Sequence, residues 1–123
     1  MATPTLGPMQ LRILQVLWEK PGSTAAEVTT HLRRRQDVAH STVQTLLRQL
    51  EEKKAVTHVR RGRVFHWSAT VAREEVTASE TRDFLERLFK GSPSGLMAHL
   101  IREEHIPEDE LRRIRRLLDQ EGA

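Results

Sequence analysis

The chain has 123 residues, which suffices for one domain or for one small domain with an appendage. It contains no run of about 18 apolar residues, and residues 1–8 lack the features of a signal peptide. We therefore expect neither membrane insertion nor secretion. Cysteine is absent, which excludes disulfides, thiolate metal sites and cysteine nucleophiles, and fits a cytoplasmic location.

The net charge of +3 is unevenly distributed along the chain. Residues 1–70 carry 11 Lys/Arg and 5 Asp/Glu, a net charge of +6, whereas residues 71–123 carry 9 and 12, a net charge of −3. The first part therefore suits a polyanionic partner and the second part a different task. Arginine outnumbers lysine 16 to 4. A GC-rich genome explains that bias at least as well as a preference of guanidinium for guanine and phosphate.

Two helices are predicted at the start of the chain. The first begins at Gly7-Pro8, with proline at a tolerated position of the first turn, and ends before Pro21-Gly22. The second begins at Thr24, because Thr24 and Glu27 have the spacing of a capping box, and it frays into residues 33–37.

The third predicted helix, which ends near Lys53, is the most informative segment. Its apolar face consists of Val43, Leu46, Leu47 and Leu50, at positions i, i+3, i+4 and i+7. The opposite face can form hydrogen bonds and has no acid; it carries Ser41, Thr42, Gln44, Thr45 and Arg48. The start is ambiguous, because Ser41 and Gln44 also match a capping box while the apolar pattern permits an earlier start.

A β-hairpin is predicted to follow this helix. Residues 56–60 and 64–68 alternate in polarity, with Gly62 in the turn between them. We expect Phe65 and Trp67, which share one face, to lie in the core together with Trp18. Three helices followed by a two-stranded hairpin predict a winged helix-turn-helix domain over residues 1–70, in a chain that is mainly α with a small β-hairpin.

Residues 71–123 are predicted to form three helices with too few apolar neighbours for a core of their own. One spans residues 71–89, a short one follows the break at residues 91–95, and the last begins at Pro107. We expect this helical domain to dimerise with a second copy; a monomer that folds back on itself is the alternative. The expected interface residues are Phe84, Leu88, Leu96, Leu100, Ile114 and Leu117.

A polar, acid-free helix face beside a basic turn predicts double-stranded DNA as the partner. Gln44 and Arg48 lie one turn apart and are the expected base contacts, because glutamine matches adenine N6/N7 and arginine matches guanine O6/N7. The alternatives are that Gln44 only caps its helix and that Arg48 pairs with Glu51 or Glu52. A dimer would read an inverted repeat with one such helix per half-site.

The other expected DNA contacts surround this pair. Ser41, Thr42 and Thr45 are predicted to touch phosphates or thymine methyl groups, although Thr42 also suits a cap. Ser23 and Thr24, at the start of the second helix, can bind a phosphate, cap the helix, or do both. The turn residues Arg60, Arg61 and Arg63 are predicted to contact phosphates or the minor groove, the alternative being a solvated basic turn.

No metal, cofactor or catalytic activity is expected. His58 and His66 lie on neighbouring predicted strands and His99 and His105 bracket a helix end, but neither pair comes with a carboxylate set suited to a metal. The sequence contains no nucleophile elbow, phosphate loop or zinc-binding helix, so the chain is not expected to be an enzyme. A winged-helix module that binds only proteins, without reading DNA, is the competing hypothesis.

The order and spacing of several segments resemble a known family over nearly the whole chain. These segments are Leu11–Trp18, Ser23–Val28, Thr42–Lys53, Ala55–Ser68, Thr81–Ser92 and Pro107–Asp119. Together they resemble the penicillinase-repressor family of bacterial transcription factors, the BlaI/MecI/CopY group. The resemblance implies a homodimeric repressor with an N-terminal winged-helix domain and a C-terminal dimerisation domain.

In the antibiotic-response members of this family, a membrane sensor protease triggers cleavage in the dimerisation domain. The resemblance places His99-Leu100 at the positions where those members usually have Asn-Phe, which makes them the possible cleavage region. A small ligand in the dimer cleft and simple dilution are the alternative routes of release. The cysteine cluster of the copper-sensing branch is absent. Lys54 stands where the family usually has a glycine after the recognition helix, which predicts a strained or different helix end.

Overall fold

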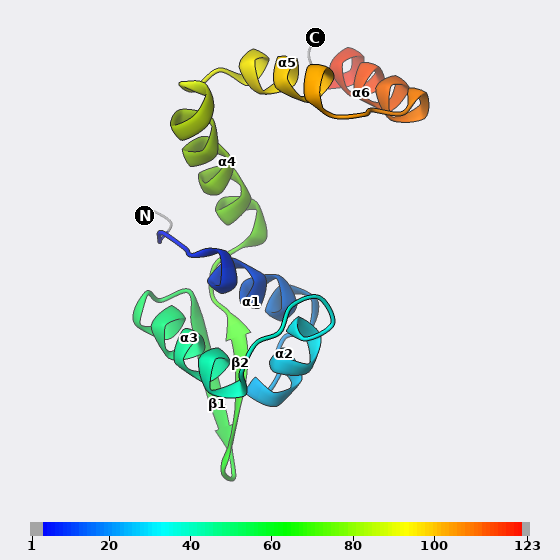
Figure 1. Cartoon of the computed structure of the whole chain (residues 1–123). Coiled ribbons are helices and arrows are strands. Elements are labelled where there is room, and N and C mark those ends of the chain that lie inside the picture. The colour runs from blue at the N-terminus through cyan, green and yellow to red at the C-terminus, as the bar shows by residue number, and fades with distance from the viewer. Residues whose placement is uncertain (1–3, 122–123) are drawn as a thin grey trace. The chain divides into compact units, whose positions relative to one another are not determined.

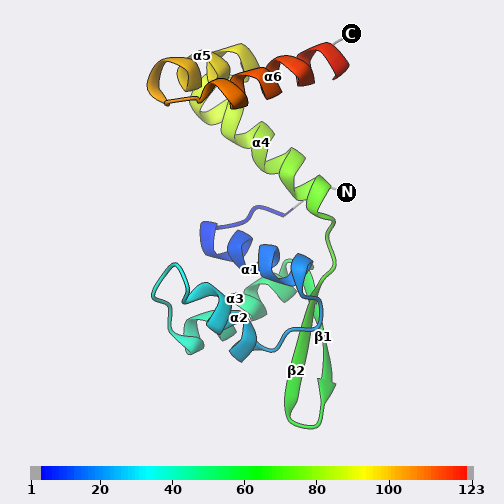
Figure 2. The ribbon, with the colours of Figure 1, turned by 90° about the vertical axis from the view of Figure 1, so that its right-hand side faces the viewer.

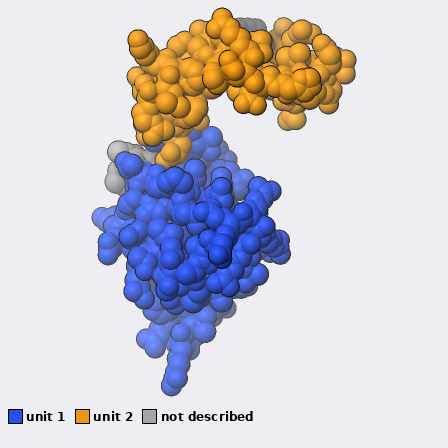
Figure 3. All heavy atoms as spheres, in the orientation of Figure 1, with its two compact units in different colours: residues 1–79 blue, residues 80–123 orange. Residues whose placement is uncertain are grey.

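The computed structural model describes residues 4–121, in which six helices and two strands occur. The mainly helical content and the single hairpin agree with the fold class predicted from the sequence (Figure 1). By its internal contacts the chain divides into two compact units, residues 1–79 and residues 80–123 (Figure 3). The predicted domain boundary after Thr70 stays a prediction.

The first unit contains the predicted winged helix-turn-helix. Helices α1 (Pro8–Glu19), α2 (Ala25–Leu32) and α3 (His40–Glu52) pack together, and the hairpin of β1 (Val56–Arg61) and β2 (Val64–Ala69) extends from them (Figures 1 and 2). The strands form a two-stranded antiparallel sheet in which Val56 pairs with Ala69 and Arg61 with Val64. Gly62, at φ +65°, opens the two-residue turn, as a type II′ hairpin requires.

The helix starts in this unit are set by local hydrogen bonds. The predicted capping box of α2 is present: Glu27 N–H donates to Thr24 Oγ1 at 3.1 Å and Thr24 N–H to Glu27 Oε1 at 2.9 Å. Helix α3 begins at His40, with Ala39 as its N-cap and no side-chain cap. The earlier of the two possible starts is therefore the observed one, and neither Ser41 nor Gln44 caps the helix.

Helix α3 ends with a residue in the left-handed region, as the missing glycine predicted. Lys54 has a φ of +63°, and Ala55 N–H donates to Leu50 O at 2.9 Å. This bond spans the last turn in the pattern of a Schellman motif, in which glycine is the usual left-handed residue.

The core of the first unit lies between the three helices and the base of the hairpin. It is built from Ile13, Leu14, Leu17, Val28, Leu32, Val38, Val43, Leu47, Leu50, Ala55, Val56 and Trp67. Trp18 is partly buried and packs against this cluster. The prediction that Phe65 belongs to the core is wrong: its side chain is 40% exposed. Phe65 lies closer to the tip of the hairpin than Trp67, and it stacks on His58 with ring centroids 4.1 Å apart.

Three further helices follow the hairpin: α4 (Arg73–Phe89), α5 (Pro93–Glu103) and α6 (Glu108–Glu121). Helix α4 begins two residues later than predicted, and the carbonyl of Val71, just before it, accepts the indole hydrogen bond of Trp18 at 2.9 Å. Helices α5 and α6 contain no buried residue in the part of the chain that the structure describes. Within residues 4–121, no helix is long and apolar enough to cross a membrane.

Candidate nucleic-acid interface

The outward face of α3 is polar and exposed, as its sequence pattern predicted. The core side of the helix buries Val43, Leu47 and Leu50 completely. On the other side, Ser41, Thr42, Gln44, Thr45 and Arg48 are all exposed. The whole helix is therefore oriented by its apolar face, and that orientation presents the hydrogen-bonding groups to solvent.

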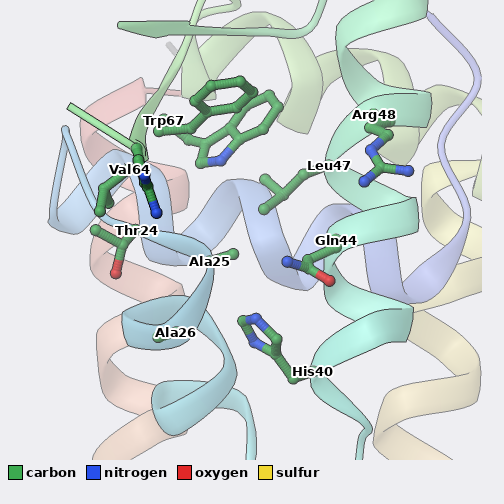
Figure 4. Close-up of a pocket in the computed structure, with 11 residues that line it drawn as sticks. Thr24, Ala25, Ala26, His40, Gln44, Leu47, Arg48, Val64 and Trp67 are labelled. Carbon is green, nitrogen blue, oxygen red and sulfur yellow. The ribbon is translucent and has the colours of Figure 1, made fainter. Parts of the chain in front are cut away.

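A groove of about 530 Å³ runs along this face. One wall is α3, and the others are the start of α2 and the strand β2 (Figure 4). The lining residues are Thr24, Ala25, Ala26, His40, Gln44, Leu47, Arg48, Arg63, Val64, Phe65 and Trp67. The groove contains two arginines and no carboxylate, so its charge favours an anionic ligand.

Gln44 and Arg48 both line the groove, and neither forms the contact that would explain it as merely structural. Gln44 is not a cap, because α3 starts before it. The ion pair that Glu51 forms is with His58, whose Nδ1 lies 2.6 Å from Glu51 Oε2, and no ion pair of Arg48 occurs within residues 4–121. Both side chains are thus available to a ligand.

Thr24 lies at the rim of the groove, whereas Ser23 does not. The Ser23 side chain is 5% exposed, and its hydroxyl donates to Lys20 O at 2.6 Å. Its backbone pairs with β2, since Trp67 N–H donates to Ser23 O at 2.8 Å. The structure therefore gives Ser23 a role in joining the start of α2 to the hairpin, and leaves Thr24 as the accessible member of the predicted pair.

The capping box also fixes a charge at the start of α2. The pKa of the Glu27 carboxyl lies below its usual value, because the carboxylate accepts the Thr24 backbone N–H and interacts with the Thr24 hydroxyl. Ala25 and Ala26 line the groove, and their backbone N–H groups take no part in that box.

The three arginines of the turn point in different directions. By strand register, Arg60 lies opposite Phe65 and Arg61 opposite Val64, so the two arginines occupy opposite faces of the hairpin. Arg60 Nε donates to Gly62 O at 2.8 Å, which holds that side chain along the turn. Arg63 lines the groove.

The predicted dimer residues all lie in α4–α6 and are covered only in part. Phe84 is 37%, Leu117 50% and Leu88 63% exposed, and the others, Leu96, Leu100 and Ile114, are half-buried. His99 is exposed on α5, and its ring packs edge-on against Phe89 with centroids 5.8 Å apart.

The histidines do not assemble a metal centre in the described part of the chain. His58 pairs with Trp67 across the hairpin and His66 with Val59, which places the two imidazoles on opposite faces. Among residues 4–121, no group of three or more potential metal ligands comes together.

One residue of the groove, His40, was not predicted from the sequence. His40 occupies the first position of α3, is exposed, and lines the groove next to Gln44. Its spacing of four residues from Gln44 is visible in the sequence, but the ambiguous helix start concealed that both belong to one helix.

Comparison with known proteins identifies the family to which this architecture belongs. A family model described as "Penicillinase repressor" matches residues 6–120. The chain belongs to the penicillinase repressor family. It is therefore a member of a family of DNA-binding transcriptional repressors and not of a family of enzymes.

Individual relatives extend over most of the chain. A transcriptional regulator BlaI of Mycobacterium tuberculosis is 29% identical over 115 residues, which are 92% of this chain and 82% of the relative. A penicillinase repressor of Bacillus licheniformis is 21% identical over 117 residues, 95% of this chain and 91% of the relative.

Two solved structures of the repressor BlaI each match more than half of this chain. The DNA-binding domain of the repressor BlaI matches with a TM-score of 0.54 and 26% identity, over 61% of this chain and 93% of that one. The B. licheniformis BlaI monomer, solved in complex with the blaP half-operator, matches with a TM-score of 0.51 and 26% identity, over 59% and 89%.

Proposed function

We propose that this repressor binds double-stranded DNA in a sequence-specific manner, as a homodimer on an inverted-repeat operator. The observation that carries the proposal is the groove in which Gln44, Arg48 and Arg63 converge without any carboxylate. The similar BlaI monomer was solved with a half-operator bound, which supports DNA as the ligand of this fold. Occupancy of a promoter would exclude RNA polymerase, and that exclusion is the proposed mechanism of repression.

Within this proposal, α3 enters the major groove and Gln44 and Arg48 read base edges. Each good bidentate pair contributes about 1–3 kcal/mol of discrimination against the wrong base. Ser41, Thr42 and Thr45 are exposed on the same face and contact backbone or thymine methyl groups.

The hairpin and the start of α2 position the protein on the duplex. Arg60, Arg61 and Arg63 contact phosphates or the minor groove, and Thr24 with the neighbouring backbone N–H groups binds a phosphate. If the dimer neutralises roughly 6–10 phosphates, the observed affinity falls with salt with a log–log slope of about −0.9 per phosphate.

A second copy of the chain is the proposed partner of the second unit. Leu88, Leu117, Leu118 and Ile101 are each at least half exposed, and α6 places Leu117 and Leu118 on one side of a charged helix. Exposed apolar surfaces of this kind mark association sites. We propose that Phe84, Leu88, Leu96, Leu100, Ile114 and Leu117 form the dimer interface.

A mobility-shift series separates base reading from phosphate contact. Arg48→Ala should reduce the preference for the operator over unrelated duplex, whereas Arg61→Ala should weaken all sequences alike and lower the salt slope by about one. Arg12→Ala is the matched control, because Arg12 is an exposed arginine that bonds Gln36 and does not line the groove. Equal binding by all three variants would favour a module that binds proteins without reading DNA.

For release of the operator we propose cleavage at His99-Leu100, triggered by a membrane sensor protease. Both residues lie inside α5, so this helix must open locally before a protease can act on the bond. Mass spectrometry of the repressor from cells exposed to a β-lactam should detect a fragment that ends at His99. An intact chain in cells that have derepressed the target genes would contradict this route and favour a ligand.

A further inference from the structure

His40 lies in the same row of α3 as the two predicted base-reading residues. Residues 40, 44 and 48 are four apart, so they stand on one side of the helix, about 6 Å apart along its axis. All three line the groove. Figure 4 shows the His40 ring beside Gln44, in the space between α3 and α2.

The neighbouring buried threonine determines the tautomer of this ring. Thr29 is 4% exposed, and its hydroxyl donates to Ala25 O at 2.8 Å. A hydroxyl has one hydrogen, so Thr29 Oγ1 can act only as an acceptor toward His40 Nδ1, which lies 3.2 Å away. Nδ1 therefore carries the proton, and the neutral imidazole keeps an unprotonated Nε2.

An unprotonated Nε2 is a hydrogen-bond acceptor that can meet base edges in a major groove. It accepts a hydrogen bond from an exocyclic amino group, which cytosine presents at N4 and adenine at N6. At the corresponding positions guanine and thymine present O6 and O4, which are acceptors and would face the nitrogen lone pair. The ring held by Thr29 therefore distinguishes amino bases from keto bases.

We propose that His40 is a third base-reading residue of α3, selecting cytosine or adenine at one position of each half-site. This inference rests on the proposed function, because it requires α3 to enter the major groove. Thr29 touches no base; it is a positioning residue that fixes the orientation and the proton of the His40 ring.

The test is selection of bound duplexes from a randomised pool with the full chain and three variants. The wild type should select adenine or cytosine at one position per half-site, about five-fold over guanine and thymine, since one hydrogen bond contributes about 1 kcal/mol. His40→Ala should abolish the preference at that position and retain the others. Thr29→Val should broaden the same position, because the freed ring can carry its proton on either nitrogen.

Thr30→Val is the matched control. Thr30 also donates its hydroxyl to the helix, to Ala26 O at 3.0 Å, but among the described residues the side-chain partner of His40 is Thr29 and not Thr30. It should leave every preference unchanged. If His40→Ala retains all preferences of a wild type that selects a defined site, the role of His40 is refuted and the proposed function stands. If the wild type selects no sequence, the proposed function itself fails.

Two further measurements test the stability of the His40→Ala variant and the tautomer of the His40 ring. Thermal unfolding should place His40→Ala near the wild type; a variant that loses all preferences together with stability would assign His40 to helix formation instead. A long-range ¹H–¹⁵N correlation spectrum of the free protein should show His40 protonated at Nδ1, with the signal identified by its loss in His40→Ala. Protonation at Nε2 would overturn the inference without any DNA present.

Discussion

Lys54 holds a left-handed conformation that is unfavourable for a residue with a β-carbon, so Lys54→Gly should stabilise the first unit. The left-handed region costs a non-glycine residue about 1–2 kcal/mol. Glycine loses about 0.5–1 kcal/mol more backbone entropy on folding. The difference predicts a net stabilisation of about 0.5–1 kcal/mol. The hydrogen bond that Lys54 O accepts from the Thr70 hydroxyl, at 2.8 Å, involves the backbone and is retained.

Urea unfolding followed by tryptophan fluorescence measures this change directly. Both tryptophans of the chain, Trp18 and Trp67, lie in the first unit, so the signal reports on the unit that contains the substitution. Protein concentration must be equal across variants, because association contributes to apparent stability. The matched control is Glu52→Gly, at the exposed last residue of α3, where glycine should destabilise by less than about 1 kcal/mol.

Opposite signs for the two glycine substitutions are the decisive result. If Lys54→Gly destabilises the protein as much as Glu52→Gly does, then the lysine side chain contributes more than its backbone conformation costs. The left-handed φ of Lys54 would then carry no net cost, and the missing glycine would leave no strain at the end of α3.

Three further predictions concern the cap, the core and the second unit. Glu27→Ala should destabilise the protein at neutral pH and have less effect in acid. The pKa of Glu27 is lowered on folding, so the Glu27 carboxylate stabilises the protein above its unfolded pKa, and this stabilisation is lost as the pH falls through its folded pKa. Urea unfolding at several pH values measures the effect. Leu47→Ala removes a fully buried side chain under the groove and should cost about 2–5 kcal/mol, measured by the same method, with a loss below 1 kcal/mol contradicting the core assignment. Leu88→Glu should convert a dimer to a monomer by light scattering, while Glu86→Ala, an exposed change on the same helix, should not; an unchanged mass for Leu88→Glu would exclude this face from the interface.

The helical pattern of the sequence was sufficient to predict the first unit and the orientation of α3. Val43, Leu47 and Leu50 recur at helical spacing, and burial of these three side chains alone decides which residues face outward. The capping box of Thr24 and Glu27 was equally predictable, because it depends on two residues that are close in sequence.

The errors and omissions arise where a contact joins distant segments. Alternation correctly placed Phe65 on the same face as Trp67, but it could not show that the core ends before Phe65. The bridge between Ser23 and Trp67 spans 44 positions and has no local pattern. The Nδ1 atom of His40 contacts the Thr29 hydroxyl on another helix. The hydrophobic periodicity of the sequence cannot predict such a contact.

The junction between α2 and the hairpin has a consequence for the thermodynamics of recognition. Gly22 and Ser23 exchange backbone hydrogen bonds with Trp67, and His66 Nδ1 lies 2.9 Å from Gly22 O. These hydrogen bonds join two walls of the groove, the start of α2 and the strand β2, in the free protein. Little conformational entropy therefore remains to be lost at this junction when DNA binds. The junction should favour a duplex whose backbone geometry already fits the groove, and should bind more weakly a duplex that must be deformed to fit.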